Sequence, residues 1–207
     1  AVEAGLISVG CEVITLGVVP TPTLMLAEEE GGGAGGLVVT ASHNSAEWNA
    51  IKLVSAEGIF LDAPMSARFH RYLAEEDPPR AGWSSLGTLR EDPGAWGRHL
   101  ARILALPHLD LEGLRARAFH VAVDCVHGAG GPAVAELLNA LGCTHEGIGM
   151  EPDGLFPRDP EPTAPNLGEL GRLVHESGAA VGLAVDPDAD RLSLVDERGT
   201  PLGEDYT

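Results

Sequence analysis

The sequence of 207 residues has few features that would suit a membrane or a nucleic acid. No apolar run approaches the roughly 20 residues that a membrane-spanning helix needs. Residues 1–6 lack the basic segment and long apolar core of a secretory signal. Basic residues are scarce, because 13 Lys and Arg stand against 31 Asp and Glu, for a net charge of -18. Nucleic acids and anionic membranes bind to basic surfaces, so we expect neither as a partner.

Cysteine is also scarce. Cys11, Cys125 and Cys143 are odd in number, far apart in the sequence and embedded in apolar stretches. No pair has the spacing of a metal site. Buried thiols that are not cross-linked are typical of a reducing compartment, so we expect a cytoplasmic protein.

The remaining composition is that of a folded chain, since hydrophobic residues make up 44% and charged residues 21%. Strand-like runs alternate with helical patterns, which favours an α/β fold with mixed, mainly parallel sheets in three layers. The expected strands cover residues 11–16, 37–39, 51–54, 119–123, 181–185 and 192–195, and the clearest helices cover 64–75 and 133–141. The composition changes after Pro107, so we expect two domains, residues 1–107 and 108–207.

Three aspartates, Asp186, Asp188 and Asp190, follow a buried strand at every second position. Crowded carboxylates of this kind suit Mg²⁺, which prefers oxygen ligands. An EF-hand calcium loop fits poorly, because its sixth position would be Arg191 where that loop needs glycine. A solvated acidic turn and a phosphatase that uses Asp186 as its nucleophile are both open from this segment alone.

The run Thr40-Ala41-Ser42-His43-Asn44 follows another buried strand and is placed to present a serine hydroxyl at the edge of a sheet. An ordinary polar turn is the simpler interpretation of these residues alone. A Ser/His/Asp triad is disfavoured, because neighbours in an extended loop point in different directions. The glycine-rich run 127–131 lacks the spacing of a dinucleotide-binding loop.

The serine run, together with Asn49 and Lys52, resembles the active-site loop of the α-D-phosphohexomutases, and residues 186–191 resemble their metal loop. This family includes phosphoglucomutase/phosphomannomutase and phosphoglucosamine mutase. Residues 18–22, 123–125, 152–157 and 195–199 also resemble family segments, in family order. Ser45, Ala50 and Pro187 depart from the family pattern without removing a reacting group.

The resemblance implies a reversible transfer of a phosphoryl group between the 1- and 6-positions of a hexose or hexosamine phosphate. Ser42 would carry the phosphoryl group, and a sugar 1,6-bisphosphate would be the intermediate. Lys52 would assist proton transfer, His43 would orient the loop and the ligand, and Arg191 would neutralise phosphate charge.

The resemblance also implies a Mg²⁺ site. Asp186, Asp188 and Asp190 would hold the ion together with an oxygen of the phosphorylated Ser42, and Asn44 would contact the substrate. The alternatives are a Mg²⁺-dependent phosphatase with an aspartyl nucleophile and a non-catalytic metal-binding α/β module.

The family fold has four domains, and the resemblance covers most of the first and nearly all of the second. Loops that recognise the sugar and its phosphate belong to the third and fourth. We therefore expect a chain truncated from a four-domain enzyme, in which residues 1–207 alone bind metal weakly and do not turn over substrate. The motifs assign neither the sugar nor an oligomeric state.

Overall fold

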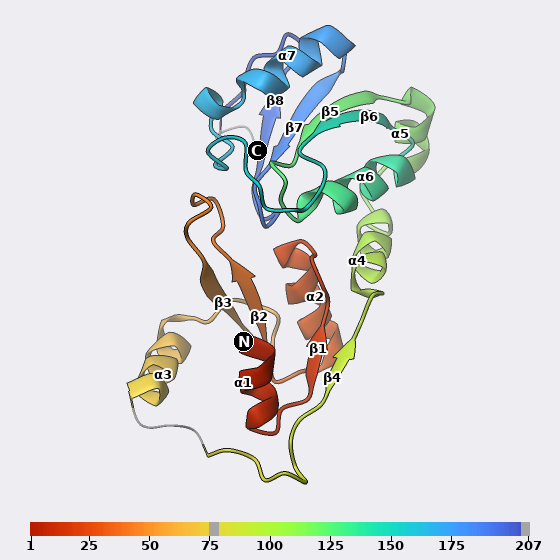
Figure 1. Ribbon diagram of the computed structural model, residues 1–207. Helices are drawn as coiled ribbons and strands as arrows, with labels where there is room; N and C mark the ends of the chain where they lie inside the picture. Colours follow the sequence, from red (N-terminus) through yellow and green to blue (C-terminus); the bar gives the residue numbers. More distant parts are fainter. Residues whose placement is uncertain (75–78, 204–207) are drawn as a thin grey trace.

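The computed structural model describes residues 1–74 and 79–203, which form two lobes that follow one another along the sequence (Figure 1). Residues 75–78 and 204–207 lie outside this description. They include the last residue of the helix expected over 64–75 and the last residues of the second expected domain.

The first lobe contains two separate two-stranded sheets. One pairs β1 with β4 in parallel, and the other pairs β2 with β3 antiparallel. The expected strands over 37–39 and 51–54 are confirmed as β2 and β3, but the strands of this lobe do not join into one mainly parallel sheet. Its elements are α1 (Val2–Ser8), β1 (Val13–Thr15), α2 (Thr21–Gly31), β2 (Gly35–Thr40), β3 (Ala50–Ser55), α3 (Ala63–Ala74), β4 (Leu89–Glu91) and α4 (Ala95–Leu104).

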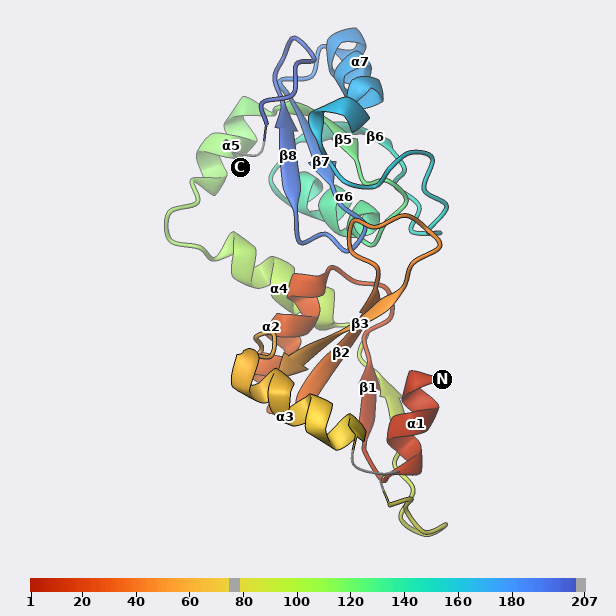
Figure 2. The ribbon, with the colours of Figure 1, turned by 90° about the vertical axis from the view of Figure 1, so that its left-hand side faces the viewer.

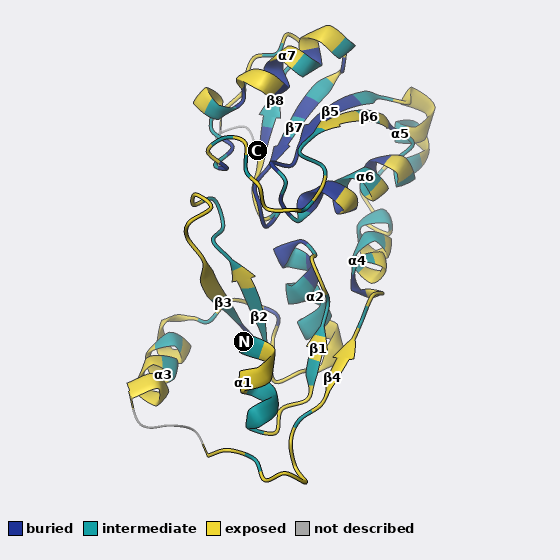
Figure 3. Ribbon diagram, viewed as in Figure 1, coloured by how far each residue is buried: buried dark blue, intermediate teal, exposed yellow. Residues whose placement is uncertain are grey.

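This lobe has a small apolar core. Among its described hydrophobic residues only Val54 and Ala95 are buried. Most of the other residues of this lobe are exposed or of intermediate burial (Figure 3). The apolar face of α3 leaves Tyr72 and Leu73 exposed. The buried hydrophobic residues of the described structure therefore lie mainly in the second lobe.

The second lobe is built on a four-stranded sheet in the order β6-β5-β7-β8. β5 runs parallel to β6 and β7, and only β8 is antiparallel to its neighbour, so the expected mixed and mainly parallel sheet is confirmed here. Its elements are α5 (Leu111–Arg117), β5 (His120–Asp124), α6 (Gly130–Ala140), β6 (Thr144–Ile148), the short 3-10 helix η1 (Ala164–Asn166), α7 (Gly168–Ser177), β7 (Val181–Val185) and β8 (Leu192–Val195).

Alternation along the strands divides the core of this lobe into two layers. Val121 and Val123 share one cluster with Leu138 of α6, whereas Ala122 shares the other with Leu170 and Val174 of α7. The sheet therefore lies between two layers of helices. Cys125 and Cys143 are buried as expected, but Cys11 is exposed, because it lies in the loop before the three-residue β1 rather than inside a strand.

The two lobes meet where the parallel strands of the second lobe end. Figures 1 and 2 show the loop between β2 and β3 and the N-terminus of α2 reaching the edge from which the β7–β8 loop projects. In α/β sheets, ligands commonly bind outside the carboxyl ends of the strands. No described helix is long and apolar enough to cross a membrane.

Candidate active site

The β2–β3 hairpin carries both the serine run and the lysine. Its register pairs Val38 with Lys52 and Thr40 with Ala50, so residues 41–49 form the loop at its tip. Ser42 therefore lies two residues beyond the end of β2, and Lys52 lies on the returning strand. One element of the first lobe thus presents both side chains to the second lobe.

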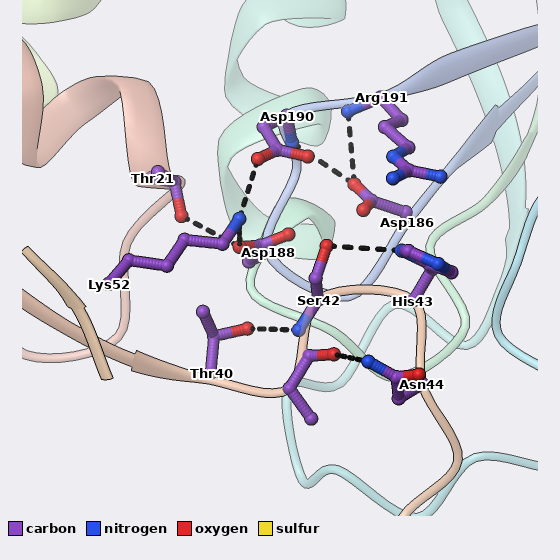
Figure 4. A network of polar contacts seen from close by, with 11 residues as sticks. Thr21, Thr40, Ser42, His43, Asn44, Lys52, Asp186, Asp188, Asp190 and Arg191 are labelled. Carbon is purple, nitrogen blue, oxygen red and sulfur yellow. Dashed lines mark hydrogen bonds and ion pairs between the residues drawn. The ribbon is translucent and has the colours of Figure 1, made fainter. Parts of the chain in front are cut away.

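Ser42 has a left-handed backbone conformation, with φ at +52°. Its N–H donates to Oγ1 of Thr40 over 2.8 Å, and its own Oγ lies 3.4 Å from Nδ1 of His43. The sequence argument that these neighbouring side chains point apart is therefore wrong, because a positive φ at Ser42 turns the chain sharply. Figure 4 shows the hydroxyl of Ser42 pointing toward the aspartates.

The three aspartates converge in the β7–β8 loop, where each offers a carboxylate oxygen within 4.8 Å of the other two. Asp186 is fully buried, and its Oδ1 accepts the backbone N–H groups of Asp190 and Arg191 at 3.0 and 3.1 Å. Its Oδ2 is buried and has no hydrogen-bond partner among the described residues.

Asp188 shows the same division between its two oxygens. Its Oδ2 accepts hydrogen bonds from Oγ1 of Thr21 at 3.0 Å and Nζ of Lys52 at 2.7 Å, whereas its Oδ1 is buried without a partner in the described chain. A bare buried carboxylate oxygen is costly unless a cation or a donor meets it. Two such oxygens in a set of hard oxygen donors fit Mg²⁺.

The electrostatics of the cluster follow from this crowding. Burial, and then the charges of Asp188 and Asp190, raise the pKa of Asp186 to about 7. Burial alone would lower the pKa of Lys52, but its hydrogen bonds and ion pairs with Asp188 and Asp190 outweigh that effect and raise it. Lys52 is therefore an ammonium ion at neutral pH, held 2.7 and 2.8 Å from the two carboxylates.

The glycine-rich run 127–131 packs against the aspartate loop at Pro187. A Cβ on Gly128 would overlap the backbone of Pro187, and Ala129 donates its N–H to the carbonyl of Pro187 over 2.7 Å. This close approach gives the run a packing role beside the aspartates, in line with its lack of dinucleotide-loop spacing.

The loop over residues 152–165 brings a further carboxylate to the site. Oε1 of Glu161 lies 3.9 Å from Nε2 of His43 and 3.4 Å from Nη1 of Arg191. Arg158 anchors this loop through Nε and Nη2, which donate to Oδ2 of the buried Asp124 over 3.0 and 2.7 Å. An open cleft of about 310 Å³ separates residues 156–160 from the serine loop.

The structure brings most of the expected site residues together, although Asn44 turns its amide back to the carbonyl of Ala41 over 2.9 Å. Thr21, Thr40 and Glu161 also lie at the site, and sequence reasoning gave none of them a role. Thr21 lies in the family-like run 18–22, which marked the segment but gave this residue no role.

The alternatives fit the geometry less well than the serine and metal arrangement. Nucleophilic attack by Asp186 would need an accessible carboxylate, and this one is fully buried with two backbone donors on Oδ1. In a Ser/His/acid triad, adjacent groups lie about 2.6–3.2 Å apart. The separations from Ser42 to His43 and from His43 to Glu161 are 3.4 and 3.9 Å.

Known proteins share both lobes. Family profiles for phosphoglucomutase/phosphomannomutase match residues 1–80 as alpha/beta/alpha domain I and residues 98–199 as alpha/beta/alpha domain II. A phosphoglucomutase/phosphomannomutase of Thermococcus kodakarensis is 36% identical over the whole chain, and a phosphoglucosamine mutase of Nitrobacter winogradskyi is 38% identical over 96% of it. The chain spans 45% and 44% of these two relatives.

A solved structure gives the same result. A phosphoglucomutase/phosphomannomutase family protein from Burkholderia thailandensis superimposes with a TM-score of 0.76 at 27% identity, over 96% of this chain and 43% of that one. The two profiles together cover most of the sequence. The domain I profile falls on the first lobe, and the domain II profile covers most of the second lobe and begins within α4. The chain therefore belongs to the phosphoglucomutase/phosphomannomutase family of the α-D-phosphohexomutase superfamily.

Proposed function

We propose that this chain supplies the phosphoserine loop and the metal loop of an enzyme that moves a phosphoryl group between the 1- and 6-positions of a hexose or hexosamine phosphate. The chain spans about half the length of its curated relatives, whose names include phosphoglucomutase/phosphomannomutase and phosphoglucosamine mutase. The proposal rests on one observation above all. Ser42 and Lys52 on one hairpin face three aspartates on a loop of the other lobe.

Ser42 is the proposed carrier of the phosphoryl group. The phosphorylated serine gives its group to the free hydroxyl of a hexose monophosphate, forming the sugar 1,6-bisphosphate, and the freed serine oxygen then takes the other phosphoryl group and releases the isomeric monophosphate. The sugar 1,6-bisphosphate is therefore the intermediate, and it also acts as activator by phosphorylating Ser42. Phosphoryl transfer depends mostly on positioning and on neutralising charge. The left-handed turn at Ser42 and its hydrogen bond to Thr40 supply the positioning.

Asp186, Asp188 and Asp190 are the residues that would hold Mg²⁺, with the phosphorylated Ser42 as a further oxygen ligand. The bare oxygens of Asp186 and Asp188 support this assignment. When bound, the ion would neutralise negative charge on the transferring phosphoryl group.

The remaining residues act on charge and protons. Lys52 has a raised pKa and is therefore an ammonium ion that offsets phosphate charge, and it would assist proton transfer at the reacting hydroxyl. Arg191 is partly exposed beside the aspartates and would attract the anionic substrate into an acidic protein. His43 would hold the ligand with help from Glu161, and Asn44 would contact the substrate after leaving the carbonyl of Ala41.

We also propose a domain boundary near residue 107, with residues 1–107 and 108–207 as the two domains. Packing of α4 against α2, and the hydrogen bond between His99 and Thr23, support placing α4 with the first lobe. A cytoplasmic location, with no nucleic acid or membrane as partner, is part of the same proposal.

Phosphoryl retention on the chain tests the proposal. We expect incubation with glucose 1,6-bisphosphate and Mg²⁺ to leave an acid-stable phosphate on Ser42, located by peptide mass spectrometry. Ser42→Ala should abolish the signal, and Ser45→Ala, three residues along the same loop, should keep it. An acid-labile phosphate on Asp186 would instead identify an aspartyl phosphatase.

A further inference from the structure

Thr21 joins the first lobe to the metal loop through two hydrogen bonds with one residue. Its Oγ1 donates to Oδ2 of Asp188 over 3.0 Å, and its backbone N–H donates to the carbonyl oxygen of Asp188 over 2.9 Å. Thr21 is 1% exposed and Asp188 is 4% exposed. The contact is therefore shielded from water, where hydrogen bonds to a carboxylate are strong.

The start of α2 explains why this N–H is available. The first N–H groups of a helix have no partner within the helix. Pro20 precedes Thr21 in an extended conformation, and no side-chain cap bond is made at this end of α2. The carbonyl of Asp188 accepts the hydrogen bond in place of a cap, so the helix is anchored to the aspartate loop.

The hydroxyl of Thr21 also determines which oxygen of Asp188 is free. Thr21 and Lys52 both bond to Oδ2, and Oδ1 is left buried and unpartnered within the described structure. Figure 4 shows Thr21 and Lys52 approaching Asp188 from the first lobe. Groups that hydrogen-bond to a ligating carboxylate orient it and commonly raise metal affinity.

We propose that Thr21 is a positioning residue that keeps Oδ1 of Asp188 available for a divalent cation and thereby couples metal binding to docking of the two lobes. The proposal rests on the assignment of the aspartates as the metal site under the proposed function. Coupling is reciprocal, so a cation that binds better when α2 is docked also strengthens the docking by the same factor.

The test compares Mg²⁺ affinity by titration calorimetry in the chain and in four variants, Thr21→Val, Thr21→Ser, Thr23→Val and Asp188→Asn. Thr21→Val keeps the shape and the backbone N–H but removes the hydroxyl, and we expect its Kd to rise about tenfold. Thr21→Ser restores the hydroxyl and should return the Kd to within about threefold of the parent value.

Thr23→Val is the matched control for burial and helix position. Thr23 is 0% exposed, lies two residues further along α2, and bonds through Oγ1 to Nδ1 of His99 over 2.9 Å. Its loss removes a buried hydroxyl from the same helix without touching the aspartate loop. We expect Thr23→Val to lower stability and leave the Kd for Mg²⁺ unchanged.

A second readout follows the docking itself. In the parent chain, Mg²⁺ should slow hydrogen exchange at the amide of residue 21, and this protection should shrink in Thr21→Val. Unchanged or tighter Mg²⁺ binding by Thr21→Val, with binding lost in Asp188→Asn, overturns the role of Thr21 and leaves the metal site intact. No Mg²⁺ binding by the parent chain overturns both the inference and the metal part of the proposed function.

Discussion

Removing the guanidinium of Arg158 should destabilise the second lobe strongly, because it leaves a buried carboxylate unpaired. The side chains of Arg158 and Asp124 are 16% and 3% exposed, and two nitrogens of the guanidinium bond to Oδ2 of Asp124. Breaking a buried pair from one side costs about 3–5 kcal/mol. For a unit the size of the second lobe, about 100 residues, that cost lowers the melting temperature by roughly 12–40 °C.

The assay must follow unfolding of the second lobe separately from unfolding of the first. Tryptophan fluorescence does not separate the lobes, because Trp48 and Trp83 are exposed and Nε1 of Trp96 donates to Glu136 of α6 in the second lobe over 2.7 Å. Amide exchange separates them, because exchange in β5 follows the second lobe and exchange in β2 and β3 follows the first. We expect Arg158→Met to speed exchange in β5 and lower the second-lobe melting temperature, with little change in exchange in β2 and β3.

The matched control is an ion pair of similar length at the surface. Nε of Arg90 lies 2.7 Å from Oε1 of Glu12, but the two side chains are 57% and 60% exposed. Exposed pairs contribute about 0–1 kcal/mol, so Arg90→Met should have little effect. An equal loss of stability in the two variants would refute the argument that burial sets the cost. Amides of β5 that exchange in the Arg158→Met chain at the parent rate would refute the same argument.

Three further predictions concern the metal loop. Because the folded pKa of Asp186 is about 7, above its ordinary value of 3.8, this group's contribution to the free energy of unfolding is fully present below pH 3.8 and is lost as the pH rises through about 7. Urea unfolding of the metal-free chain should show this decline in stability. Asp186→Asn or added Mg²⁺ should remove the decline. Gly128→Ala should cost about 1–3 kcal/mol and weaken Mg²⁺ binding, because its Cβ overlaps the backbone of Pro187. Gly168→Ala, where nothing lies within 4 Å of the added Cβ, should change neither property in the same unfolding and calorimetric measurements. Lys52→Met should tighten Mg²⁺ binding, because the positive charge of Lys52 lies 2.7 and 2.8 Å from two of the carboxylates and repels a second cation. Calorimetry that shows weaker binding would contradict this repulsion.

The sequence predicts the second lobe better than the first. The observed bounds of β7 and β8 are those expected, because apolar runs end sharply at the polar loop between them. β4 was not expected, because a strand of three residues forms only through its pairing with β1, far away in the sequence. α5 was also missed, since it is short and buries none of its residues.

The candidate site shows a similar division. The types and order of the reacting residues are visible in the sequence, since they occur in short runs with family-like spacing. The contact between Ser42 and His43 depends on one positive φ angle, and the contact between Thr21 and Asp188 depends on how the lobes dock. Neither a backbone angle at a non-glycine residue nor a docking geometry can be read from the residues themselves.

The backbone at Ser42 also restricts which amino acids can serve there. A φ of +52° crowds the Cβ of any L-residue, and a branched Cβ makes the crowding much worse. Threonine carries the same hydroxyl, yet its extra methyl group would disfavour the turn that aims the oxygen at the aspartates. Glycine would accept the turn but has no oxygen to phosphorylate. The shape of the chain at this one position therefore selects serine over its nearest chemical equivalent.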